Sequence, residues 1–282
     1  MTAAAWRREL AGSLGAIAHA EPVAGGDIND AWRLELADGR RMFVKTHDAP
    51  PPEMFAAEAD GLAWLAEGPL RVPRVIAVGA GFLALEWLDL GGGHDASFDE
   101  RFGRGLAQLH ALGAPRLGHA RDNYIATLPQ DNAAAPDIAT LWTERRLRPM
   151  IARLGDRALV DRLLGRLDRL AAQPERFGPP ERPARLHGDL WRGNVGCVRG
   201  SEPVIFDPAV YGAHREIDLA MLGLFGGLGE RLIAAYHEVW PLADGWRARL
   251  GLWQLYPLAV HAVLFGGGYQ SQLARGLDAA LA

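Results

Sequence analysis

Two carboxylates and an amide lie close together in the stretch 185–208. Asp189 follows a His-Gly pair, Asn194 stands five residues later, and Asp207 ends a short apolar run. Such oxygen-bearing side chains on a loop and at a strand end can hold Mg²⁺ and orient a hydroxyl group during phosphoryl transfer. We expect Asp189 to accept the proton of an attacking hydroxyl, and Asn194 and Asp207 to bind the metal. A solvated polar loop would leave this combination unexplained.

Three further residues are expected to support this loop. His187 is interpreted as a structural residue, hydrogen-bonded within the loop, and not as a base. Asp218 stands at the start of a predicted helix, where it either interacts with the helix dipole or caps the backbone of the His187 loop. Trp191 either stacks on a substrate or anchors the loop.

Lys45 is the only Lys among 30 basic residues. A chain that uses Arg almost everywhere keeps one compact ammonium group here, at the end of a predicted strand. Glu58 lies thirteen residues later on the apolar face of a predicted helix, where a carboxylate needs a cation. We expect Lys45 to contact nucleotide phosphates while paired with Glu58; an exposed strand cation is the simpler alternative.

The remaining nucleotide contacts are predicted from position. A glycine turn before the Lys45 strand could cover phosphates with its backbone N–H groups, although such turns usually only join strands. The chain that leaves the predicted sheet could contact the adenine edge. The predicted residues are Gly25, Gly26, Asp27, Ile28 and Asn29 in the turn, and Glu86, Trp87 and Leu88 after the sheet.

The elements around these residues indicate an α+β bilobal, protein-kinase-like architecture. A helix over 6–17 precedes predicted strands at 31–36, 42–45, 75–78 and 82–88, with a helix at 53–67 among them. Gly91 to Gly93 are interpreted as a flexible joint between lobes at 1–88 and 89–282. The second lobe is mainly helical, with predicted helices at 98–111, 138–154, 156–171, 216–225, 229–239 and 246–265.

Composition limits the function classes. The 282 residues carry a net charge of −4, which gives no general attraction to nucleic acid or an anionic membrane. The apolar stretch 250–265 is too short to span a bilayer, and residues 1–20 lack the apolar core of a signal peptide. A single Cys197 fits a reducing compartment, so we expect a cytoplasmic protein.

The sequence as a whole resembles the fructosamine kinase, or ketosamine kinase, family of protein-kinase-like small-molecule kinases. The motifs that carry the resemblance cover nearly the whole chain: GGDIND, VKTH, DNYI with LPQDN, RRLRP, LHGDLWRGN and YGAHREIDLAM. The resemblance implies phosphorylation by ATP and Mg²⁺ of the 3-hydroxyl of a ketosamine or glycated amine, whose unstable product releases the amine. It also implies substrate contacts from Asn123, Tyr124 and Gln130. Arg121 stands where the family often has His.

Other functions use the same residues. An aminoglycoside or choline kinase would share Lys45, Asp189, Asn194 and Asp207, so only the two family segments DNYI/LPQDN and RRLRP argue against it. A protein kinase is disfavoured because Pro208, not Phe-Gly, follows Asp207. A nucleotide-binding scaffold without activity is disfavoured because every phosphate, metal and base position is filled. The residues leave the preferred ketosamine open, and they allow a monomer or a dimer.

Overall fold

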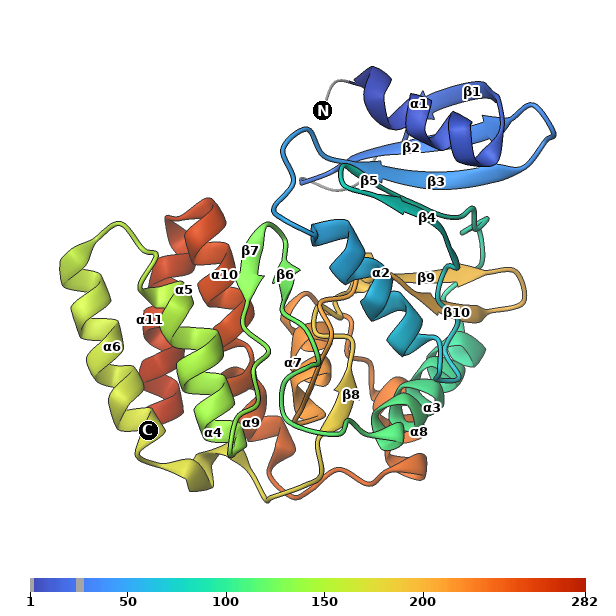
Figure 1. Ribbon diagram of the computed structural model, residues 1–282. Coiled ribbons are helices and arrows are strands. Elements are labelled where there is room, and N and C mark those ends of the chain that lie inside the picture. The colour runs from blue at the N-terminus through green and yellow to red at the C-terminus, as the bar shows by residue number, and fades with distance from the viewer. Residues whose placement is uncertain (1–2, 24–27) are drawn as a thin grey trace.

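The computed structural model describes residues 3–23 and 28–282. Figure 1 shows a small sheet with two helices beside a larger, mainly helical part. The α+β architecture expected from the sequence is therefore confirmed. The boundary predicted after residue 88 falls between the last sheet strand and the first long helix of the larger part.

The small part is built on a five-stranded antiparallel sheet in the order β1-β2-β3-β5-β4. A tight turn at Asp38 joins β2 to β3, and the Asp38 carboxylate accepts a hydrogen bond from the Arg40 N–H at 3.0 Å. The strands are β1 (Ile17–Pro22), β2 (Asp30–Leu36), β3 (Arg41–Thr46), β4 (Val75–Gly79) and β5 (Phe82–Glu86).

Two helices cover opposite faces of this sheet (Figure 1). On one face, Trp6 and Leu10 of α1 (Ala3–Leu14) pack with Met42 and Val44 of β3. On the other, the buried stripe of α2 (Met54–Leu65) packs against β5. Because side chains alternate along a strand, Lys45 points to the α2 face and toward Glu58.

Two long amphipathic helices of the larger part, α3 and α6, begin at acidic N-caps. Asp95 caps α3 by accepting from the Phe98 N–H at 2.9 Å, and Asp156 caps α6 by accepting from Leu159 at 3.1 Å. Its helices are α3 (Ala96–Leu112), α4 (Ile138–Thr140), the π-helix η1 (Leu141–Leu147), α5 (Arg148–Ile151), α6 (Arg157–Ala171), α7 (Glu216–Leu224), α8 (Glu230–Val239), α9 (Trp246–Trp253), α10 (Leu255–Phe265) and α11 (Gly268–Leu281). Short turns of 3₁₀-helix lie at η2 (Pro174–Phe177) and η3 (Arg192–Asn194).

Three antiparallel strand pairs interrupt the helices. They are β6 (Asn123–Ile125) with β7 (Leu128–Gln130), β8 (Ala184–Leu186) with β11 (Tyr211–Ala213), and β9 (Val195–Val198) with β10 (Glu202–Ile205). The last two pairs carry the loop singled out in the sequence, so the expected short strands around it are present.

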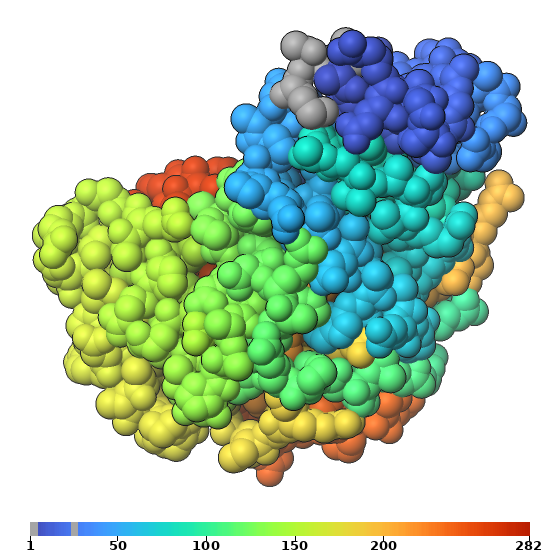
Figure 2. Space-filling view, viewed as in Figure 1, coloured from blue at the N-terminus to red at the C-terminus, as the bar shows by residue number. Residues whose placement is uncertain are grey.

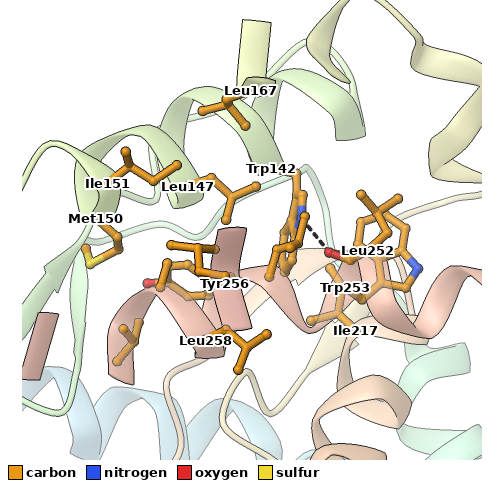
Figure 3. Close-up of a cluster of buried hydrophobic side chains, with 14 of the residues drawn as sticks. Trp142, Leu147, Met150, Ile151, Leu167, Ile217, Leu252, Trp253, Tyr256 and Leu258 are labelled. Atoms are coloured by element: carbon orange, nitrogen blue, oxygen red, sulfur yellow. Dashed lines mark hydrogen bonds between the residues drawn. The ribbon is translucent and has the colours of Figure 1, made fainter. Parts of the chain in front are cut away.

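Aliphatic side chains and a few large aromatic ones, among them Trp142, Trp253 and Tyr256, form the core of the larger part (Figure 3). Trp142 and Trp253 meet edge to face with ring centroids 5.2 Å apart. The indole N–H of Trp142 donates to the Leu252 carbonyl at 3.2 Å, so the buried polar atom is satisfied. Ala184 and Leu186 of β8 and Tyr211 and Ala213 of β11 belong to the same core, which therefore supports the two strands that flank the Asp189 loop.

The structure corrects several predicted boundaries. The first helix ends at Leu14, because Ile17 pairs with Leu36 in the sheet instead of continuing the helical face. The predicted helix at 246–265 is two helices, and Pro257 lies in the first turn of the second, where its missing N–H needs no partner. The β6–β7 hairpin and α11 were not predicted.

Across the residues that the structure describes, no helix combines the length and apolar character needed to cross a membrane.

Candidate active site

The loop after β8 is held by one buried carboxylate. Asp218, in the first turn of α7, accepts hydrogen bonds from the His187 N–H at 2.8 Å and the Gly188 N–H at 2.9 Å. Its Oδ2 also lies 3.0 Å from Nε2 of His110 on α3. Burial opposes the charge, but the His110 hydrogen bond and charge keep the pKa of Asp218 below its ordinary value. Asp218 therefore caps this backbone, one of the two alternatives left open by the sequence.

His187 lies inside the loop it was expected to support. Its Nε2 lies 2.9 Å from the Phe206 carbonyl oxygen, and its ring is buried. Burial lowers the pKa of His187, which favours a neutral ring. The geometry agrees with a structural role and leaves the ring no route to a substrate proton.

Asp189 and Asn194 face each other across the loop. The Asn194 amide nitrogen lies 2.9 Å from the Asp189 carbonyl oxygen and 3.2 Å from its carboxylate Oδ2. Burial, and then repulsion by the Asp207 carboxylate, raise the pKa of Asp189 to about 7. A carboxyl group with a pKa near neutrality is suited to exchange a proton with a hydroxyl at working pH.

Asp207 leaves β10 with a positive φ of 59°, in the left-handed region that non-glycine residues rarely adopt. Such backbone strain is concentrated at functional sites. The turn brings its Oδ1 to 2.5 Å from the Lys45 ammonium, while 42% of its side-chain surface stays exposed. Asp207 thus connects the helical part to the sheet.

Lys45 lies between two carboxylates that come from distant parts of the chain. Its Nζ is 2.6 Å from Oε1 of Glu58 and 2.5 Å from Oδ1 of Asp207, and only 6% of the residue is exposed. Burial opposes its charge, yet Asp207 and then Glu58 hold the pKa of Lys45 above its ordinary value. The predicted Lys45–Glu58 pair is present, and the ammonium group is fixed where the two parts meet.

The oxygen donors present fit a magnesium ion. The Asp207 carboxylate is the second cause, after burial, of the raised pKa of Asp189, and a divalent cation held by Asp207 would offset this repulsion. Asn194 would add an amide oxygen, since carboxylate and amide oxygens are the ligands that Mg²⁺ prefers. In the described part of the chain, no group of three or more His, Cys, Asp or Glu residues forms a metal cage. With Asn194 and Asp207 as ligands, the other coordination positions of Mg²⁺ would be left to phosphate oxygens and water.

The predicted phosphate-covering turn is only partly described. Gly25, Gly26 and Asp27 lie outside the described residues. Ile28 is exposed and Asn29 is half-buried, just before β2. The Val23 N–H donates to the Ala31 carbonyl at 2.9 Å, which brings the two ends of this turn together beside the Lys45 strand.

Residues 86–88 leave β5 toward the larger part, as expected for an adenine-contacting segment. The Glu86 carboxylate binds Arg71 at 2.9 Å, and the Trp87 indole donates to Asp89 at 2.8 Å. Their side chains thus have protein partners, and Leu88 is half-buried. Contact with adenine through backbone groups stays a prediction.

The structure does not favour substrate contact for Asn123 and Gln130. Both are buried, and the Gln130 amide donates to the Asn123 side chain at 2.8 Å and to the Ala209 carbonyl at 3.1 Å. Asn123 in turn donates to the Val210 carbonyl at 2.9 Å. This network supports the segment after Asp207, because buried amides are placed by the groups they bond.

Tyr124 points to α2. Its hydroxyl donates to the Pro52 carbonyl at 2.9 Å, immediately before the helix that carries Glu58. In Figure 2 the green residues of this segment lie directly against the blue residues of α2. A contact with the small lobe, rather than with substrate, is therefore its observed interaction.

Trp191 extends from the catalytic loop with 39% of its surface exposed. Its ring meets that of Phe225 edge to face at 5.8 Å. Substrate contacts were predicted for Asn123, Tyr124, Gln130 and Trp191. Of these four residues, Trp191 has the most exposed aromatic ring.

Sequence reasoning missed His110. It ends the apolar stripe of α3 and bridges Asp218 to Tyr236, whose hydroxyl lies 2.8 Å from Nδ1. A histidine among the leucines of an amphipathic helix needs a buried polar partner, so the position of His110 could have indicated a buried hydrogen bond. The partner itself lies 108 positions away and could not be read from local spacing.

The fold and site define a class: a protein-kinase-like phosphotransferase architecture in which a lysine of the sheet pairs with a glutamate of α2, and a loop of the larger part carries an Asp–Asn pair. The profile of the fructosamine kinase family matches residues 1–282. A probable ketoamine kinase of Synechocystis is 40% identical over 269 residues, covering 89% of this chain and 86% of the relative. The chain belongs to the fructosamine kinase family.

Solved structures agree with this assignment. A crystal structure from Thermobifida fusca, named provisionally as a fructosamine-3-kinase, is 40% identical with a TM-score of 0.87 and covers 98% of both chains. The choline kinase LicA from Streptococcus pneumoniae has a TM-score of 0.65 over 98% of this chain and 97% of its own, but only 12% identity. The second similarity concerns the fold alone, so the alternative of a choline-type kinase gains no support beyond the shared architecture.

Proposed function

We propose that this protein is an ATP-dependent ketosamine 3-kinase that uses Mg²⁺. The observation that carries the proposal is the Asp189–Asn194 pair lying below Lys45, Glu58 and Asp207 in a member of the fructosamine kinase family. The names of the similar proteins, ketoamine kinase and fructosamine-3-kinase, support a ketosamine as the acceptor.

Each residue has a separate task in this proposal. Asp189 accepts the proton of the sugar 3-hydroxyl. As the proton leaves, the hydroxyl oxygen forms a bond to the γ-phosphorus of ATP, and the bond between that phosphorus and the departing ADP breaks. Lys45 contacts the nucleotide phosphates while Glu58 holds its ammonium group. Asn194 and Asp207 would hold the metal, which would supply positive charge to offset that of the phosphates. The product is a ketosamine 3-phosphate, whose breakdown releases the amine and so undoes glycation.

The decisive experiment measures ADP release with a panel of free ketosamines, aminoglycosides and choline. We expect turnover with ketosamines and none above background with the other acceptors. ATP binding without turnover of any acceptor would instead support a nucleotide-binding scaffold.

Replacement of the proposed base provides a second test. Asp189→Ala should lower kcat by at least about a hundredfold, since general-base catalysis contributes roughly 10²–10⁴-fold, while nucleotide binding is retained. Fluorescence titration with an ATP analogue would check binding. Near wild-type turnover in this variant would refute the assignment of Asp189.

The cytoplasmic location and the monomeric or dimeric state expected from the sequence remain predictions, as does the absence of nucleic-acid and membrane partners. Sedimentation and fractionation of the native protein would test them.

A further inference from the structure

A continuous group of partly exposed aromatic rings extends from the catalytic loop. We call it the aromatic patch: Trp191, Phe225, His261, Phe265 and Tyr269. Ring centroids follow one another at 5.8 Å from Trp191 to Phe225, 5.7 Å to His261 and 4.9 Å to Tyr269. Trp191 is 39%, Phe225 41% and Phe265 57% exposed, and contiguous exposed apolar side chains mark candidate binding surfaces.

The inner end of the patch is built into the candidate active site. The backbone N–H of Trp191 donates to the Asp189 carbonyl at 3.1 Å, so the residue that carries the indole is held in a tight turn two positions from the proposed base. Gly193 lies under the indole: a Cβ there would come within 2.2 Å of the ring. The ring orientation therefore depends on the same short turn that presents Asn194.

The outer end is supplied by three helices. Phe225 follows the last residue of α7, His261 and Phe265 lie on α10, and Tyr269 lies on α11. The His261 ring is oriented by Nδ1, which lies 2.6 Å from the Pro257 carbonyl oxygen. Because all three helices contribute side chains to the core of the larger part, packing fixes the backbone from which these rings extend.

Substrate chemistry indicates what this surface would contact. A ketosamine is a sugar joined to an amine, so when its 3-hydroxyl lies at Asp189 the rest of the molecule must extend away from that carboxylate. The secondary amine is protonated near neutral pH, and an ammonium group is attracted to aromatic faces. An apolar group beyond the amine would in turn bury surface against rings.

We propose that the aromatic patch binds the amine-derived part of the substrate and selects free ketosamines in which that part is aromatic or bulky and apolar. The inference rests on the proposed function. It goes beyond it by assigning Phe225, Phe265 and Tyr269 to substrate selection, and by naming a substrate class: sugar adducts of apolar amino acids or aromatic amines.

The test compares two ketosamines with the same sugar, one made with glycine and the other with phenylalanine. For the wild-type protein we expect kcat/KM to be about tenfold higher for the phenylalanine adduct, the gain expected from burying one aromatic side chain partly against rings. Phe265→Ala and Phe225→Ala should each reduce this ratio severalfold, with most of the change in KM.

Leu112→Ala is the matched control. Leu112 is also a large apolar side chain, 49% exposed, at the end of α3 and outside the patch. Its removal should leave the ratio unchanged. Thermal unfolding of all variants checks that they are folded. Because Phe265 is highly exposed, we expect Phe265→Ala to have nearly the wild-type stability.

The outcomes separate the two proposals. Equal kcat/KM for both adducts, or a ratio untouched by both Phe variants, would overturn the patch assignment while leaving the kinase function standing. A change in oligomeric state without a change in ratio would overturn it in favour of a contact between copies. Efficient turnover of a glycated protein, unaffected by both variants, would also overturn it. Lack of turnover with either adduct would overturn the proposed function itself.

Discussion

The charge of Asp189 links the chemistry of the site to the stability of the protein. Its ordinary pKa is 3.8, and burial followed by repulsion from Asp207 raises the pKa to about 7 in the folded protein. A raised carboxyl pKa means that the folded state prefers the protonated form. The stability that this preference contributes is present below about pH 4 and is lost as pH rises to about 7.

Asp189→Asn should remove this dependence. Without nucleotide, we expect the variant to be more stable than wild type at pH 8 by about 1–3 kcal/mol, a discounted figure because the side chain is partly open to solvent. At pH 4 the two should be nearly equal. Urea unfolding at both pH values measures the difference.

Glu175→Gln is the control, since it neutralises a carboxylate on an exposed surface turn. It should follow the wild-type pH dependence. Parallel stability curves for Asp189→Asn and wild type would contradict the cause assigned to the Asp189 pKa.

Among the elements, helix α2 is bonded to the larger part at several points along its length. Tyr124 bonds the chain just before the helix, His119 Nε2 lies 2.9 Å from the Asp60 carboxylate, and Arg185 donates to the Trp64 carbonyl at 2.7 Å. The helix that carries Glu58 is therefore held by the β6–β7 segment and the strand before the catalytic loop. The DNYI segment, one of the motifs of the family resemblance, thus contacts the helix that carries Glu58, the partner of Lys45.

Tyr124→Phe should weaken this attachment. Loss of a hydrogen bond worth about 1 kcal/mol should raise the KM for ATP about fivefold and leave the KM for ketosamine unchanged. Steady-state kinetics with each substrate varied in turn gives the answer. A selective rise in the ketosamine KM would instead favour the substrate contact that the resemblance implied.

Sequence patterns predicted those contacts of the site that follow from the spacing of nearby residues. A carboxylate on an apolar helix face required a cation, and the Lys45–Glu58 pair exists. The β6–β7 hairpin escaped prediction because its three-residue strands are held by buried amides and show no apolar alternation. The aromatic patch escaped because packing of α7, α10 and α11 brings its rings together from positions far apart in the sequence.

The chain segment that connects the two parts of the whole molecule is bonded at Gly92 and Gly93 to Cys197. The sequence suggested a flexible joint at Gly91 to Gly93, but the Gly92 N–H donates to the Cys197 carbonyl at 3.0 Å and the Cys197 thiol lies 3.3 Å from the Gly93 oxygen. A Cβ at Gly92 would lie 2.2 Å from the Val198 carbonyl oxygen. The connection is thus attached to the β9–β10 pair that leads to Asp207.

Gly92→Ala should therefore destabilise the protein by about 1–3 kcal/mol, because the backbone must shift to relieve the contact. Gly91→Ala and Gly93→Ala are matched controls, since an added Cβ at either position meets nothing within 4 Å. Chemical unfolding of the three variants tests this. Equal stability of all three would show that the attachment at Gly92 contributes nothing.

The single lysine has a consequence for the durability of the protein. Reducing sugars attack unprotonated amines, and the only lysine side chain of this sequence is Lys45. It is 6% exposed, paired with two carboxylates, and kept charged by its raised pKa. A protein proposed to repair glycated amines thus exposes no lysine amine that sugars could attack. It can work in the presence of reducing sugars without Lys45 becoming glycated.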